Sequence, residues 1–237
     1  AVTLDQDAII GTMTMNDTSD PYNNWMISQG GTYGLTFDVS SGNAALGVTR
    51  GTTNAINVPV TLNDNLDITV SNDSKVTVGG DVDGTGKLTI TGSSSNEGTV
   101  RLTGTNTFNG GLYLNYGSLE FTNAAAFGAG AIEYGNSTIG DKLYLTNDSG
   151  GAVDISNSFT AASGTTVWNG VYLQGDSMIF SGTFDTAPYA TVVGMNFYID
   201  APVVTINNGI GSNHLYKTGS SSGSGQLNLM AASNGGQ

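Results

Sequence analysis

The 237-residue sequence has no cysteine and only one histidine. Without cysteine there can be no disulfide bonds, so strand stacking must stabilise the fold. A zinc site or a Ser-His-Asp triad would have to use His214. It stands among small and polar residues with no second histidine in the chain. We therefore expect His214 to be a surface or turn residue rather than a catalytic one.

Charged residues are also scarce, at 11% of the chain, and they give a net charge of -13. Nucleic acids and anionic membranes are bound by clustered basic residues. The basic residues here are scattered singly: Arg50, Lys75, Lys87, Arg101, Lys142 and Lys217. The sequence thus predicts no nucleic-acid partner. An acidic balance is typical of a secreted protein that carboxylates keep soluble.

Long apolar runs are missing as well. A membrane helix needs about 18 consecutive apolar residues, and we find no such run, so we expect no membrane insertion in this segment. A basic and apolar signal sequence is also not seen. The opening Ala1–Leu4 is compatible with a mature N-terminus left by signal removal.

Glycine is abundant, with 35 residues, and it separates short alternating segments. The pattern is clearest in Gly98–Phe121, where apolar residues alternate with polar ones in three places: Val100 and Leu102, Leu112 and Leu114, and Leu119 and Phe121. Alternation with a period of two places each pair on one face of a strand. Gly and Asn residues between the pairs can turn the chain. One coil of a β-solenoid has this pattern, and it needs similar coils above and below it.

Similar strand signals recur along the chain at a spacing of roughly 8 to 12 residues, which is typical of all-β folds. No segment combines a helical apolar pattern with caps, and Ala124–Phe127 can form one short turn at most. We predict an all-β fold, with a parallel β-solenoid as the leading architecture. A β-sandwich-like all-β fold is the alternative.

Ten residues form a motif in this region: Leu102, Thr103, Gly104, Asn106, Thr107, Phe108, Gly110, Gly111, Gly117 and Leu119. The motif resembles the autotransporter-associated β-strand repeat. That resemblance implies a right-handed parallel β-helix in a secreted bacterial surface protein. It also implies structural roles for these residues and no catalytic or ligand-binding role.

We expect two regions along the chain. Residues 1–75 are predicted to form N-terminal coils with an irregular cap or loop at Asp17–Gln29, and Pro59 is expected at a bend or an unpaired edge. Residues 76–237 are predicted to form regular coils that include the repeat at 98–121. The segment from Tyr216 to Leu229 is similar to the opening of another repeat, which is compatible with truncation at the C-terminus.

Two acid pairs are candidates for chemistry. Asp5 with Asp7, and Asp81 with Asp83, each place two carboxylates on one strand face. Clustered acids on a β-helix face can serve a polysaccharide-acting enzyme. Arg50 and Arg101 lie far from both pairs in the sequence, so we expect no enzyme.

Asp81 and Asp83 also form half of a calcium loop. Glu97 is too distant to complete that loop, and the simpler interpretation is a Gly-rich corner with solvated acids. Calcium is therefore a weak candidate, and we predict no cofactor.

Asparagine and the aromatic residues offer two further possibilities. Corner asparagines Asn106, Asn109, Asn115 and Asn123 could stack from coil to coil, as in cross-β ladders. Ten tyrosines and two tryptophans could form a sugar-binding stripe, but Trp25 and Trp168 are isolated in the sequence. Packing in the core or cap is the default expectation for these aromatic residues.

The leading prediction is a non-catalytic extracellular or cell-surface β-helix that serves as a stalk, adhesin or passenger scaffold. One alternative is a self-assembling subunit of an extracellular filament. Another is a polysaccharide-acting enzyme or a carbohydrate-binding module. The corresponding partners are further copies of the chain and a host or glycan surface.

Overall fold

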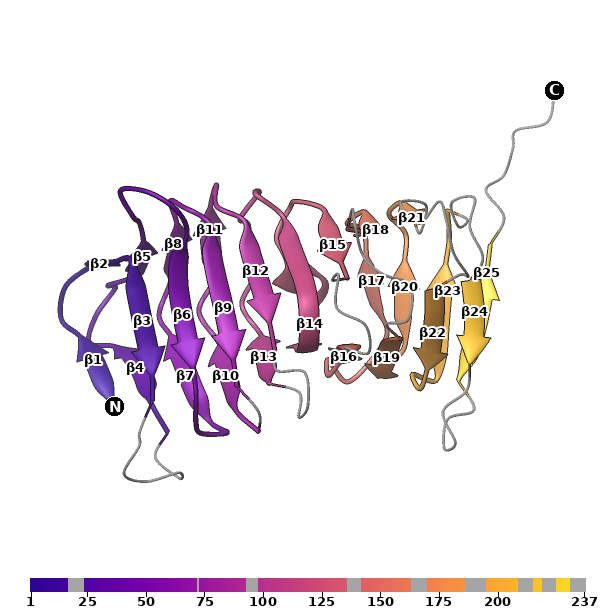
Figure 1. The fold of residues 1–237 in the computed structure, drawn as a ribbon, viewed down its shortest axis with the longest axis horizontal. Coiled ribbons are helices and arrows are strands. Elements are labelled where there is room, and N and C mark those ends of the chain that lie inside the picture. Colours follow the sequence, from indigo (N-terminus) through magenta and orange to yellow (C-terminus); the bar gives the residue numbers. More distant parts are fainter. Residues whose placement is uncertain are drawn as a thin grey trace.

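The fold is a β-solenoid in which short strands wind around one long axis (Figure 1). It is seen in a computed structural model, which describes residues 1–16, 24–71, 73–92, 98–135, 142–162, 170–185, 195–208, 215–218 and 225–230. The chain passes three faces in turn, which we name A, B and C. Each strand pairs with the strand on the same face in the next coil.

Faces A and C are continuous stacks of strands. Face A holds β1 (Val2–Leu4), β4 (Met26–Gln29), β7 (Asn54–Asn57), β10 (Lys75–Val78), β13 (Thr99–Leu102), the second half of β14 (Leu112–Phe121), β16 (Leu143–Asn147), β19 (Val171–Gly175), β22 (Met195–Ile199) and β24 (Leu215–Thr218). Face C holds β3 (Thr12–Met15), β6 (Ala44–Val48), β9 (Leu66–Val70), β12 (Leu88–Thr91), the first half of β14, β15 (Ile132–Tyr134), β18 (Phe159–Ala161) and β21 (Phe184–Asp185).

Face B consists of two separate four-stranded sheets. The first contains β2 (Ala8–Ile10), β5 (Leu35–Phe37), β8 (Val60–Leu62) and β11 (Val82–Gly84). The second contains β17 (Val153–Ile155), β20 (Met178–Phe180), β23 (Val203–Ile206) and β25 (Gln226–Leu229). The corner Gly104–Gly111 and the 3-10 turn η1 (Ala124–Phe127) lie between the two sheets.

The core is a set of apolar columns that run along the axis. One column on face A consists of Val76, Val100, Leu119, Leu145 and Leu173, each of which is fully buried. In-register parallel stacking keeps apolar residues over one another, because a slip of one residue would turn every side chain outward. Burial of each such side chain stabilises the fold by roughly 1.5–3 kcal/mol.

Coils differ in length although their strands stay in register. Ile27 lies beside Ile56 in the next coil, whereas Val100 lies beside Leu119. The extra residues of the longer coils lie in the corners. The shorter coil is compact because β14 passes directly from face C to face A at Gly117, where a positive φ of 98° lets one strand turn the corner.

The parallel β-solenoid predicted from the sequence is confirmed, since all the recorded strand pairs are parallel. The sandwich-like alternative is wrong, because its sheets are antiparallel. The three strand signals of Gly98–Phe121 are β13 and the two halves of β14. Pro59 lies in the bend between β7 and β8, as expected.

The predicted irregular region at Asp17–Gln29 needs correction. Met26–Gln29 forms strand β4, which pairs with β1 and β7 on face A, and positions 17–23 lie outside the described residues. Pro21, Asn23 and Asn24 precede this strand, and its two apolar residues are adjacent rather than alternating, so the sequence pattern did not indicate it. Face A is continuous where the two regions expected from the sequence meet, because β7 pairs with β10, which begins at Lys75.

Ala124–Phe127 forms the single short turn that the sequence allows. Within the described ranges, no helix is long and apolar enough to cross a membrane.

Candidate functional site

The repeat motif forms a corner on face B. Leu102, Phe108 and Leu119 point into the core and are fully buried. The corner runs between β11 and η1, because Thr107 donates its N–H to Val82 and Ala129 donates its N–H to Phe108. The segment therefore replaces a face-B strand in its coil.

Asn106 is the buried polar residue of this corner, with 4% of its surface exposed. Its Oδ1 accepts the N–H of Val82 in the preceding coil at 2.8 Å, and its Nδ2 donates to the carbonyl of Ala126 in the following coil at 2.7 Å. The side chain thus joins three coils with both ends of its amide used. Leaving either group unsatisfied in the core would be costly.

Three glycines let neighbouring backbones approach the corner. A Cβ at Gly104 would lie 2.4 Å from the carbonyl oxygen of Gly80, and a Cβ at Gly110 would lie 2.4 Å from Gly86. Gly111 has a φ of 90°. Thr103 is half-buried and Thr107 is exposed.

Other buried amides use the same arrangement. Asn54 accepts the N–H of Trp25 and donates to carbonyls that include Lys75, so it also joins three coils. Asn147 donates to Ser177 in the next coil at 2.8 Å. These contacts show that asparagine at the corners bonds mainly to the backbone of adjacent coils.

The corner asparagines named from the sequence were expected to stack on one another, but the hydrogen bonds recorded for Asn106, Asn115 and Asn123 go to other residue types in adjacent coils. Asn123 donates to the backbone of Thr103 and Gly104, while Asn115 contacts Thr91 at 3.4 Å. A hydrogen bond between asparagine side chains of adjacent coils occurs elsewhere, where Asn65 donates to Asn43 at 3.3 Å.

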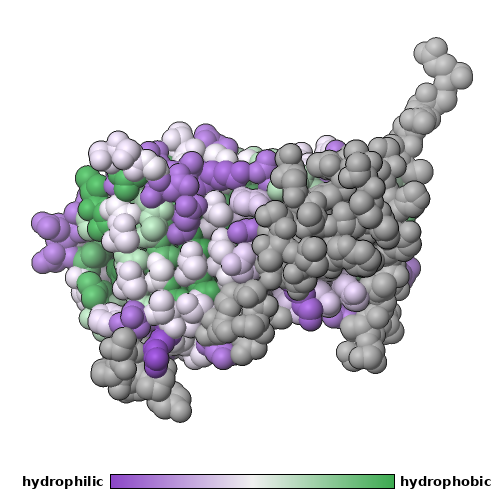
Figure 2. Space-filling view, viewed as in Figure 1, coloured by the Kyte–Doolittle hydropathy of each residue, from purple (hydrophilic) through white to green (hydrophobic). Residues whose placement is uncertain are grey.

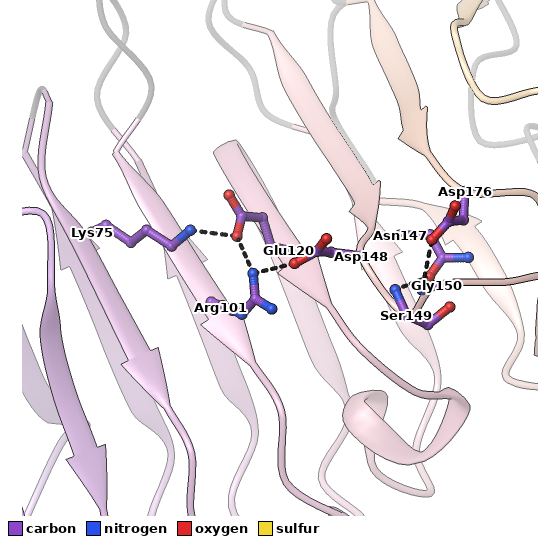
Figure 3. Close-up of polar contacts among 8 residues, drawn as sticks. All are labelled: Lys75, Arg101, Glu120, Asn147, Asp148, Ser149, Gly150 and Asp176. Carbon is purple, nitrogen blue, oxygen red and sulfur yellow. Dashed lines mark hydrogen bonds and ion pairs between the residues drawn. The ribbon is translucent and has the colours of Figure 1, made fainter.

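A charged network crosses face A (Figure 3). Glu120 accepts from Lys75 at 2.5 Å and from Arg101 at 3.1 Å, and Arg101 also pairs with Asp148. The four residues belong to successive coils, and Lys75, Arg101 and Glu120 each have less than a third of the side chain exposed. Burial of Arg101 disfavours its charge, but Asp148 and Glu120 outweigh this and raise the pKa of Arg101 above its ordinary value.

A second polar group lies on face C. Lys87 pairs with Glu133 and lies 5.2 Å from the centre of the Tyr113 ring. The Tyr113 hydroxyl donates to the carbonyl of Gly135 at 2.6 Å. Burial and the nearby Glu133 carboxylate both raise the pKa of Tyr113. In these two groups, Lys75, Arg101 and Lys87 contact neighbouring carboxylates or a tyrosine ring rather than lining a cleft.

The two predicted acid pairs lie in different coils: Asp5 and Asp7 lie between β1 and β2, and Asp81 and Asp83 lie at β11. Asp7 accepts the N–H of Gly34 at 2.9 Å, and Asp81 accepts the N–H of Thr105 at 2.7 Å. One carboxylate of each pair therefore holds the next coil's backbone, while Asp5 and Asp83 are exposed. In the part of the chain that the structure describes, no three His, Cys, Asp or Glu side chains gather into a metal-holding group.

The remaining candidates are not brought to these pairs. Arg101 belongs to the face-A network, and Arg50 is exposed. Glu97, Trp168 and His214 lie outside the described residues.

Three tyrosines form a ladder that the sequence analysis did not align. Tyr144, Tyr172 and Tyr198 lie side by side on the outer surface of face A, with ring centres 4.6 and 4.3 Å apart and planes within 19°. Each of three successive coils has a tyrosine at the same register position, so the ladder can be recognised once the register is known. Their ring faces are turned toward each other, whereas sugars stack on free ring faces, so this ladder is a poor carbohydrate platform.

Two hollows lie among the described residues. A groove of about 390 Å³ lies on face B beside η1, lined by small and neutral residues such as Thr107, Ala125 and Asn157. A void of about 10 Å³ in the core, lined by residues such as Phe37 and Leu46, is apolar throughout. It gives a water molecule no polar partner, so we expect this void to be dry.

These arrangements join coils to each other and place no convergent reactive groups around either hollow. Comparison of the chain with protein-family models, with curated proteins and with solved structures finds no match. The resemblance to the autotransporter-associated repeat stays a prediction drawn from the motif itself.

Proposed function

We propose that the chain is a non-catalytic structural β-helix of an extracellular or cell-surface protein, which serves as a stalk, adhesin or passenger scaffold. The observation that supports this proposal is the unbroken core. Apolar columns run from coil to coil, and the buried amides of Asn54, Asn106 and Asn147 bond to adjacent coils. Such an arrangement stiffens the long axis and displays the corners sideways.

The low charge and the lack of cysteine agree with an exterior protein that is stabilised by stacking rather than by disulfides. The motif resemblance is the support for a bacterial surface location. A host or glycan surface is the partner class that an adhesin would contact.

Limited proteolysis combined with electron microscopy tests the scaffold proposal. We expect short rods of constant width and slow digestion. The protease must have broad specificity, because trypsin has only six basic target residues in this chain. Leu119→Asp is the matched control, since it places a charge in a fully buried column and should give rapid digestion. A compact globule, or wild-type digestion as fast as that of the control, would contradict the proposal.

The enzymatic alternative has a direct test. A polysaccharide-acting enzyme would release reducing ends from acidic or mucin-type glycans, and Asp83→Ala would abolish that release. Asp83 is exposed, so this substitution should leave the fold intact. Calcium binding by Asp81 and Asp83 would appear in the same samples as heat release on titration with calcium.

A further inference from the structure

The tyrosine ladder on face A brings three phenol rings into contact. Tyr144, Tyr172 and Tyr198 occupy one register position in three successive coils, with ring planes that differ by 19° and 6°. The other ring contacts among the described residues all include a phenylalanine. Ser118 precedes the ladder in the same register column, and Thr218 follows it. The ladder therefore consists of three phenols with fixed neighbours.

Gly170 leaves space for two of these rings. A Cβ at position 170 would lie 2.5 Å from a ring carbon of Tyr198 and 3.0 Å from a ring carbon of Tyr172. Any other residue at this position would push against the rings. The backbone beside the ladder is thus compatible with close stacking and with rotation of the rings.

The ladder is partly exposed and lies apart from the apolar surface. Each of its tyrosines is half-buried on the outer side of face A. The exposed large apolar side chains of the described residues lie elsewhere: Val2, Ile9, Trp25, Met26, Leu229 and Met230. Figure 2 shows hydrophobic residues gathered at the end of the molecule that holds β1 to β4. A small oxidant in solution can therefore reach the phenols.

We propose that the ladder is a site of oxidative cross-linking, in which Tyr172 forms a carbon–carbon bond with Tyr144 or Tyr198 and joins two coils covalently. The chain has no cysteine, so a disulfide cannot supply such a link. The proposal rests on the ring geometry and does not depend on the scaffold function, although a covalent link between coils would strengthen a rod.

The reaction removes one electron and one phenolic proton from each of two tyrosines. Two one-electron oxidants, such as those that a haem peroxidase makes from hydrogen peroxide, accept the electrons, and water accepts the protons. The two phenoxyl radicals then join through ring carbons next to the carbons that carry the oxygens. Each joined carbon gives up its hydrogen while the oxygen regains one, which restores both aromatic rings. The product is dityrosine, which has two hydrogen atoms fewer than two tyrosines.

The ladder holds the reacting rings close to this product. Two directly bonded aromatic rings have centres about as far apart as the ring centres here, so the rings must turn but need not approach. In-register strands keep the two backbones side by side while the rings turn. Holding two reactants together in this way removes much of the entropic barrier to their reaction.

Oxidation of the dilute purified chain by a photo-generated one-electron oxidant tests the proposal. We expect a monomer that has lost two hydrogen atoms and shows dityrosine fluorescence. Mass spectrometry of its peptides should find Tyr172 linked to Tyr144 or Tyr198, and thiol reduction should leave the link intact. The absence of a link within the chain, or links that join other tyrosines in preference to the ladder, would overturn the proposal.

Two phenylalanine variants separate the ladder from general tyrosine oxidation. Tyr172→Phe retains the stacked ring but has no phenolic hydroxyl to oxidise, so it should abolish the link. Tyr113→Phe is the matched control, because the Tyr113 ring contacts Lys87 and its hydroxyl donates to Gly135 on another face. The control should cross-link like the wild type. Equal yields from the wild type and Tyr172→Phe would refute the assignment.

The linked chain should also resist unfolding. A covalent link between coils restricts the unfolded chain, as a disulfide does, so the midpoint of thermal unfolding should rise after oxidation. Oxidised Tyr172→Phe corrects for damage elsewhere and should show no such rise. An equal rise in both samples would show that the ladder does not join the coils.

Oxidation in urea tests whether the fold directs the reaction. The register that aligns the three tyrosines exists only in the folded chain, so the ladder pairs should lose their preference over other tyrosines. Unchanged selectivity in urea would overturn the proposal. The rods and the slow digestion expected of a scaffold are measured on the unoxidised chain, so the two hypotheses can fail separately.

Discussion

Buried amides in this chain connect successive coils. Asn54, Asn106 and Asn147 are each less than 5% exposed, and each has its amide bonded to backbone groups. An asparagine can both accept and donate, so one side chain can serve the coil above and the coil below. Aspartate in the same position could only accept while charged.

Replacement of Asn106 by alanine should therefore destabilise the fold. The change leaves the Val82 N–H and the Ala126 carbonyl unsatisfied, at a cost of about 1–3 kcal/mol for each group. Urea denaturation measures the free energy of unfolding. Asn109→Ala is the control, because Asn109 is exposed and should change stability by about 0.5 kcal/mol or less. Equal losses for the two variants would contradict the role of the buried amide.

Tyr113 should make stability depend on alkaline pH. Its pKa is raised in the folded state, so above the ordinary value of about 10 the unfolded chain loses its proton first. The folded state then holds more protons than the unfolded state, and stability falls as pH rises toward the folded pKa. Phenolate absorbance during a pH titration locates that pKa. Tyr113→Phe should lose less stability over the same range, and an identical loss would refute the effect.

At the scale of elements, faces A and C hold their outer charges differently. The face-A network links Lys75, Arg101, Glu120 and Asp148 over several strands, whereas Lys87 and Glu133 on face C form one pair. Single surface pairs contribute about 0–1 kcal/mol, and networks contribute more reliably.

Glu120→Gln should thus cost about 1 kcal/mol at low salt, because Lys75 and Arg101 both lose their shared acceptor charge. Glu133→Gln removes the isolated pair and should cost less. Both losses should shrink in concentrated salt, where screening weakens partly exposed pairs. Denaturation midpoints at two salt concentrations provide the measurement. A larger loss for Glu133→Gln would show that the network has no added effect.

The tyrosine ladder should stabilise face A through its middle member. Tyr172 contacts both Tyr144 and Tyr198, so Tyr172→Ala removes two ring contacts, each worth about 0.5–1.5 kcal/mol beyond burial. Tyr172→Phe retains the rings and should stay close to wild type in thermal unfolding. If the phenylalanine variant fell as far as the alanine variant, the hydroxyl rather than the stacking would be responsible.

The fold was largely predictable from the sequence because alternation reports which side chains face inward. Val100 with Leu102 and Leu112 with Leu114 alternate with polar residues in the sequence, and all four are buried in β13 and β14. Register was not predictable, since coils differ in length at their corners. The tyrosine ladder and the network around Arg101 depend on register, so they emerged only with the structure.

At the scale of the molecule, the end strands should open most readily. In the part of the chain that the structure describes, β1 to β3 are paired on one side, whereas strands such as β12 and β14 are paired on both. We expect backbone amides of β12 and β14 to exchange with deuterium far more slowly than those of β1. Mass spectrometry of the exchanged peptides measures this difference. Uniform protection along the chain at high dilution would contradict it.

The direction of the hydrogen bonds has a mechanical consequence. In every coil the covalent chain runs around the axis, while the ladder bonds between strands run along it (Figure 1). A pull on the two chain ends therefore loads the ladders in series, so every ladder carries the full force and the least stable coil separates first. The molecule should lengthen stepwise at modest force, because single coils unfold one after another and dissipate the applied energy. Bending, in contrast, must stretch the tightly packed columns on one side, so the same rod that yields to tension resists flexing.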